Sequence, residues 1–89
     1  MKIQVTELYQ NIPNPFRYET TISSDMENSD NMTLEFFDVT GKVLKRINKY
    51  FDKGLNSVKV EFDDDINGVI YYRMTTGEFT KTLKMLKIK

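Results

Sequence analysis

Apolar and polar residues alternate along short stretches of this chain, and glycine, proline and asparagine separate the stretches. Met32, Leu34 and Phe36 are apolar while the residues between them are polar, and the same alternation recurs over residues 58–62. Successive side chains of a β-strand point to opposite faces of the sheet, so this period of two is typical of strands with one buried face. No segment repeats its apolar positions with the longer period of a helix.

The pattern predicts seven strands, at Ile3–Leu8, Glu19–Ser24, Met32–Asp38, Val43–Tyr50, Asn56–Phe62, Val69–Thr75 and Phe79–Ile88. Turn residues fall between them at short and fairly even intervals, which is the signature of a β-sandwich. The prediction is an all-β, immunoglobulin-like antiparallel sandwich that forms one domain over residues 1–89. Within it, residues 1–12 are assigned either to the first strand or to a linker.

Glycines mark the predicted turns. Gly41 lies in the turn from Asp38 to Lys42, where a short hairpin loop needs a residue with positive φ. Gly77 is assigned the same role between the last two strands. Two further glycines are each expected to begin a strand, Gly54 and Gly68.

Two prolines define a different kind of segment near the start of the chain. Pro13 and Pro15 lack a backbone donor, so residues 11–15 are expected to be extended and to lie at a sheet edge. The following Phe16 is expected to dock into the end of the sandwich.

The 89 residues include no cysteine and no histidine, and the formal net charge is zero. These absences exclude disulfides, thiol nucleophiles and the commonest general base and metal ligand. Zero net charge gives no long-range attraction to nucleic acid or to an acidic membrane. The composition therefore favours a binding, structural or targeting module without a cofactor, and argues against an enzyme or a nucleic-acid partner.

Four motifs follow one another along the chain. Residues 8–16 read Leu-Tyr-Gln-Asn-Ile-Pro-Asn-Pro-Phe, with Thr-Thr-Ile at 20–22, and residues 37–42 read Phe-Asp-Val-Thr-Gly-Lys. The closing strands carry Gly-Val-Ile-Tyr-Tyr-Arg at 68–73 and Lys-Thr-Leu-Lys-Met-Leu at 81–86. In this order and spacing, the chain resembles the C-terminal sorting domain (type A) of the type IX secretion system, also called the Por secretion system, of Bacteroidota. Its departures from the family pattern are modest, at Ile12, Arg17-Tyr18 and Ile70.

The resemblance implies a sorting signal carried at the end of a larger cargo protein, whose functional part lies upstream in the same polypeptide. The cargo passes through the periplasm, and outer-membrane translocon and shuttle components recognise the folded domain. A cell-surface sortase-like protease then generally removes it, which leaves the cargo released or attached to the cell surface.

The last two strands are the candidate recognition surface, because the chain ends in an ordered hairpin. The candidate sorting residues are Gly68, Tyr72, Arg73, Gly77, Lys81, Lys84 and Met85. A second set is assigned to the structural motifs: Asn14, Pro15, Phe16, Asp38, Gly41 and Lys42. The exposed edge is also a place where a partner strand, or a second copy in an edge-strand dimer, could pair.

Several side chains have both a functional and a structural interpretation. The alternative function is an adhesive or carbohydrate-binding sandwich, with stacking by Tyr9, Tyr71 and Tyr72, although such aromatics more often fill or flank the core. The closing lysines either contact acidic groups such as lipopolysaccharide phosphates or keep an edge strand soluble, and the second interpretation is favoured for Lys81, Lys84, Lys87 and Lys89.

The acidic residues likewise have both a functional and a structural interpretation. Residues 63–65 are three consecutive aspartates with oxygen ligands for Ca²⁺, but adjacent acids alternate in direction, so a solvated loop is favoured. An acid–base pair of carboxylates needs a cleft for which so small a sandwich has little room.

Overall fold

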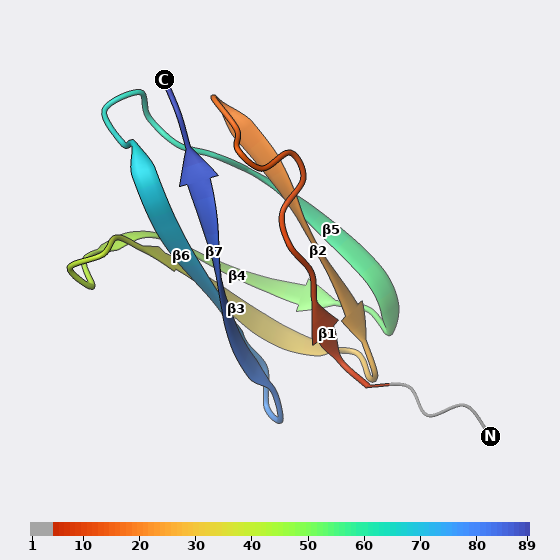
Figure 1. Ribbon diagram of the computed structural model, residues 1–89. Coiled ribbons are helices and arrows are strands. Elements are labelled where there is room, and N and C mark those ends of the chain that lie inside the picture. The colour runs from red at the N-terminus through yellow and green to blue at the C-terminus, as the bar shows by residue number, and fades with distance from the viewer. Residues whose placement is uncertain (1–4) are drawn as a thin grey trace.

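The computed structural model describes residues 5–89, which form seven strands in two antiparallel sheets (Figure 1). The strands are β1 (Glu7–Leu8), β2 (Glu19–Met26), β3 (Asp30–Phe37), β4 (Val43–Phe51), β5 (Gly54–Glu61), β6 (Gly68–Thr75) and β7 (Thr80–Lys87). One sheet has the order β1-β2-β5 and the other has the order β4-β3-β6-β7. The predicted all-β sandwich is confirmed. No helix able to cross a membrane occurs within residues 5–89.

The core lies between the two sheets and follows from the period of two. In β3, Met32, Leu34 and Phe36 are buried while the residues between them are more exposed. The ring of Phe36 meets Phe62 edge-on, with 5.3 Å between ring centroids. Phe62 also lies 6.1 Å from the ring of Phe16, centroid to centroid. Aromatic pairs of this kind add about 0.5–1.5 kcal/mol to the burial of their surface.

The last strand occupies one edge of the four-stranded sheet. Among the strands of residues 5–89, β7 pairs with β6 alone, in an unbroken antiparallel register from Gly68↔Lys87 to Thr75↔Thr80, and its other edge forms an isolated bridge to Phe16. β6 pairs on its other side with the central strand β3. The outward edge of β7 is therefore the place where a neighbouring segment can add backbone hydrogen bonds.

Strands β2 and β3 run further into the polar segment 24–31 than predicted, and only residues 27–29 remain between them. The pattern concealed this extension because a polar residue, Ser24, occupies an inward position of β2. Its hydroxyl donates a hydrogen bond to the Glu7 carbonyl at 2.7 Å, which satisfies the buried oxygen.

The first predicted strand, Ile3–Leu8, is shorter than expected. Within the described residues only Glu7 and Leu8 are in β1, where they pair with β2, while Val5 and Thr6 precede the strand. The part of this prediction that falls on Ile3 and Gln4 lies outside the described residues.

Gly41 has the predicted positive φ (+90°), while Gly54 and Gly68, which were expected only to begin strands, begin β5 and β6 with φ of +98° and +96°. The role assigned to Gly77 was wrong, because its φ is not positive. Its N–H instead donates to Asp30 Oδ2 at 3.0 Å, and an added Cβ would lie only 3.2 Å from that oxygen. Close approach of a carboxylate, not turn geometry, is what favours glycine at this position.

Candidate functional site

Residues 9–16, called the strap below, run along one open side of the sandwich (Figure 1). Ile12 exchanges two backbone hydrogen bonds with Thr21 of β2, at 2.9 and 2.8 Å. Four residues later, the N–H of Phe16 donates to the Leu86 carbonyl of β7 at 3.0 Å. The strap therefore passes from the three-stranded sheet to the four-stranded sheet and joins the two.

Side chains of the strap cover the C-terminal half of the β7 edge. Asn14 Oδ1 accepts a hydrogen bond from the Leu86 N–H at 2.9 Å. Gln10 Nε2 donates to the Lys84 carbonyl at 2.7 Å. The first and the last motif of the sequence are thus in direct contact, although more than seventy residues separate Asn14 from Leu86 along the chain.

Tyr72 connects the strap to the core through two hydrogen bonds. Its side chain is fully buried in β6, its hydroxyl oxygen accepts the Asn11 N–H at 3.0 Å, and its O–H donates to the Tyr9 carbonyl at 2.8 Å. Burial raises the pKa of Tyr72 to about 12, because the phenolate loses its hydration inside the protein. Tyr72 is therefore a packing residue whose polar end holds the strap.

We expect Tyr72→Phe to lower the free energy of unfolding at neutral pH by ~1–3 kcal/mol, because the Asn11 N–H loses its partner inside the protein. The pH dependence gives a second readout. The pKa of Tyr72 is higher in the folded state, about 12, than the ordinary 10.0, so its contribution is complete below pH 10 and is lost as the pH rises toward 12.

Urea unfolding between pH 7 and pH 12 measures both effects. The wild-type protein should lose about 2–3 kcal/mol more than the Tyr72→Phe protein over the alkaline range. Parallel curves for the two proteins would contradict the assigned role of the hydroxyl.

The other candidates divide by the face they occupy. Met85 is buried in the core, and Gly68 has a positive φ at the start of β6, so both shape the sandwich. Arg73 and Lys84 are exposed on the side of the four-stranded sheet that faces away from the core. Only the second pair is available to a partner.

Two of the closing lysines lie in surroundings that the sequence did not indicate. Lys81 Nζ is 3.7 Å from Glu7 Oε2 and 3.4 Å from the Leu8 carbonyl, because β1 lies opposite β7 at the edge of the sandwich. Lys87 was expected on a solvated edge, and this was wrong, because it takes an inward position of β7 and is only 2% exposed.

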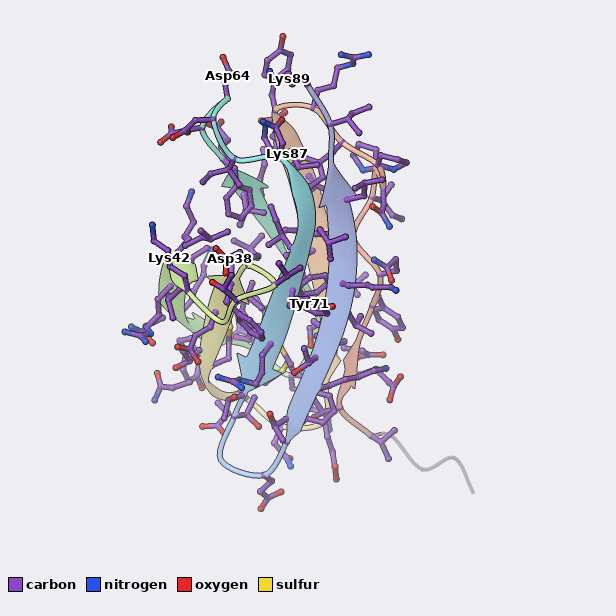
Figure 2. The ribbon with its side chains drawn as sticks, turned by 60° about the vertical axis from the view of Figure 1, so that its left-hand side comes forward. Asp38, Lys42, Asp64, Tyr71, Lys87 and Lys89 are labelled. Carbon is purple, nitrogen blue, oxygen red and sulfur yellow. The ribbon has the colours of Figure 1, made fainter. Side chains whose placement is uncertain are left out.

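The outward side of the four-stranded sheet, called the outer face below, carries two stacked aromatic rings with positively charged side chains beside them. Phe37 and Tyr71 stack with 5.7 Å between ring centroids, and the Arg73 guanidinium lies 5.4 Å from the Phe37 centroid. Lys84 is the cross-strand partner of Tyr71. Figure 2 shows Tyr71 on this sheet, away from the Lys87 end.

A single carboxylate organises the arginines of the outer face. Glu35 accepts from Arg46 at 2.7 Å and from Arg73 at 3.0 Å. Hydrogen bonds from Arg46, and then from Arg73, lower the pKa of Glu35 from its ordinary value. Sequence reasoning missed Glu35, Phe37 and Arg46, although the alternation in β3 already places Glu35 and Phe37 on one face.

The motif around Gly41 is a structural turn. Asp38 Oδ1 accepts hydrogen bonds from the Thr40 hydroxyl at 2.6 Å, the Thr40 N–H at 2.9 Å and the Lys42 N–H at 3.0 Å. The Thr40 hydroxyl is the main reason that the pKa of Asp38 lies below its ordinary value. In Figure 2, Asp38 and Lys42 lie side by side at this turn.

Within residues 5–89, the candidate residues for carbohydrate stacking and for metal binding are not brought together into a site. Tyr9 is exposed on the strap, Tyr71 lies on the outer face and Tyr72 is in the core, so the three do not form one stacking platform. Residues 63–65 are exposed, and no group of three acidic residues in the described part of the chain is arranged to hold a metal ion.

The fold and the site define a small antiparallel β-sandwich whose last strand is locked to its first motif. A family model described as "Secretion system C-terminal sorting domain" matches residues 10–89, and the chain belongs to this family. It is a sorting domain of type IX secretion. The family is not one of enzymes, and membership implies export to the cell surface or secretion.

Similarity outside this family concerns the fold alone. No curated protein matches the sequence. Among solved structures, the chain is similar to a beta-glucosidase from Listeria innocua in complex with glucose, with a TM-score of 0.50 and 11% sequence identity. The match covers 96% of this chain but only 16% of the glucosidase.

Proposed function

We propose that the type IX machinery recognises this domain in its folded state, and not as a linear peptide. The observation that carries the proposal is the contact between the strap and β7. Residues 68–89 are hydrogen-bonded to Tyr9, Asn11, Asn14 and Phe16, none of which belongs to the closing hairpin. A free peptide with the closing sequence would lack these partners and the core beneath it.

The outer face is the proposed contact surface for an outer-membrane translocon or shuttle component. Tyr71 and Phe37 supply an apolar centre, which Val69 and Leu86 extend at about two-fifths exposure. On the outer face, the cations Arg46, Arg73 and Lys84 outnumber the carboxylate of Glu35. The partner surface is accordingly apolar at its centre and acidic around it, because opposite charges across an interface favour association and orient it.

The remaining steps of sorting follow the same proposal. The domain accompanies its cargo through the periplasm, reaches the translocon and is cut off by a sortase-like protease at the cell surface. Lys84 and Arg73 are the proposed contact residues, whereas Gly68, Tyr72, Gly77, Lys81 and Met85 act by maintaining the surface.

An export assay tests the proposal. A fluorescent protein with a signal peptide is joined to the intact domain, or to a domain truncated after Gly77, in a Bacteroidota host with and without a working translocon. We expect the cargo at the surface or in the medium only with the intact domain and the working translocon. Equal export with the truncated domain, or no export with the intact one, would refute a sorting role that depends on the closing strand.

A further inference from the structure

A lysine side chain is buried at the end of the sandwich where β7 finishes. Lys87 faces inward and is 2% exposed. The strand is held on either side of it, because the Phe16 N–H donates to the Leu86 carbonyl at 3.0 Å and the Ile88 N–H donates to the Phe16 carbonyl at 2.9 Å. The backbone of Lys87 is thereby fixed, and its side chain is packed instead of extending freely into solvent.

Lys87 lines a cavity of about 450 Å³ at this end of the molecule, together with Arg17, Tyr18, Asp64, Asp65 and Lys89. Lys87 is only 2% exposed, so little of its side chain meets solvent. None of the ion pairs within residues 5–89 includes Lys87. A lysine so little exposed and without a counter-charge is unfavourable. Because no buried side-chain nitrogen in residues 5–89 lacks a hydrogen-bond partner, the Lys87 ammonium group keeps some contact with solvent, where an anion can reach it.

The remaining walls of the cavity support the same interpretation. Arg17, whose guanidinium donates to the Lys89 carbonyl, brings a second fixed cation to the rim, and Lys89 brings a third. Asp64 and Asp65 are the competing internal partners, but both are exposed and neither forms an ion pair within the described residues. Figure 2 shows the Asp64 side chain extending away from Lys87.

We propose that this cavity binds a phosphate group, with Lys87 as the buried cation and Arg17 as the residue that fixes the orientation of the oxyanion. A guanidinium offers paired N–H donors that match phosphate oxygens, and an ammonium supplies a compact point charge. The cavity is larger than a phosphate ion and falls in the size range of small-molecule sites, so it has room for the group that carries the phosphate. This site is separate from the outer face and does not rest on the sorting role.

Titration with inorganic phosphate against chloride at equal ionic strength, followed by amide NMR, tests the site on the intact chain. We expect saturable shifts at the amides of Arg17, Lys87 and Lys89. Lys87→Met keeps the buried stem and removes the charge, so it should stay folded and bind phosphate at least about tenfold more weakly. Lys84→Met, which removes an exposed charge from the same strand, should bind as the wild type does.

Two results would overturn the proposal: equal affinity in the Lys87→Met protein, or shifts spread over all exposed lysines, which would mean surface ion binding only. The double variant Asp64→Asn/Asp65→Asn gives an independent test if Lys87→Met fails to fold. Removing the two competing carboxylates should strengthen phosphate binding, and unchanged affinity would also overturn the proposal.

The source of the phosphate is distinguished with vesicles. Binding to vesicles that contain phosphatidic acid, but not to phosphatidylcholine alone, and dependence of that binding on Lys87, would identify a lipid phosphate. Binding of free phosphate without vesicle binding would identify a soluble phosphorylated ligand.

Discussion

Replacing Phe16 with alanine is expected to unfold a large fraction of the domain and to stop export, although residues 68–89 keep their sequence. The Phe16 side chain is buried against Phe62, and its backbone holds the end of β7. Truncation of a buried phenylalanine costs ~3–5 kcal/mol. If a domain of this size lies at the low end of the usual range, with about 5 kcal/mol of total stability, little would remain.

The matched control lies in the same motif. Ile12→Ala also shortens an apolar side chain of the strap, but Ile12 is 74% exposed and contributes through its backbone bonds to Thr21. Urea unfolding of both variants, alongside the export assay, separates stability from recognition. Normal export of a Phe16→Ala protein that is shown to be unfolded would mean that the closing sequence alone is the signal.

Reversing one charge on the outer face is expected to block partner binding without unfolding the domain. Lys84 is exposed beside Tyr71, and its hydrogen bond with the strap uses its backbone carbonyl, so Lys84→Glu should leave the melting temperature nearly unchanged. Loss of a central interface residue costs ~2 kcal/mol or more of binding free energy, which is about thirtyfold in affinity. Export should fall in parallel with the affinity for the purified translocon component.

Lys53→Glu provides the control for net charge. Lys53 is an exposed residue of the β4–β5 turn, away from the outer face, and the substitution changes the formal charge by the same amount. If both variants export equally well, the outer face is not the contact surface. If both fail equally, the protein's total charge, and not this face, controls recognition.

Local pattern was sufficient to predict most of the strands. The alternation from Met32 to Phe36 and from Val58 to Phe62 predicted β3 and β5, since in both strands a buried and an exposed face alternate. Gly41 was placed correctly, because a positive φ in a short turn is a local requirement. The docking of Phe16 into the sandwich was also predicted, and its side chain is buried.

The features that define the site depend on pairs distant in sequence. Nothing near Asn14 indicates that its side chain accepts the Leu86 N–H, and nothing near Lys81 indicates Glu7. The burial of Lys87 follows from its inward register in β7, which a pattern of lysines on both faces could not reveal. The role of Gly77 was predicted wrongly for the same reason, because its N–H binds the carboxylate of Asp30, which is distant in the sequence.

Val5 and Lys89, the first and last described residues, lie at opposite ends of the sandwich. Val5 and Thr6 lie beside the β6–β7 turn, where they line a common cavity with Thr76 and Phe79, whereas Lys89 lies at the other end (Figure 1). A polypeptide that precedes Val5 is therefore connected to the end of the sandwich opposite Lys89. A cargo joined at that end does not need to cover the end that carries Lys89, whatever its size.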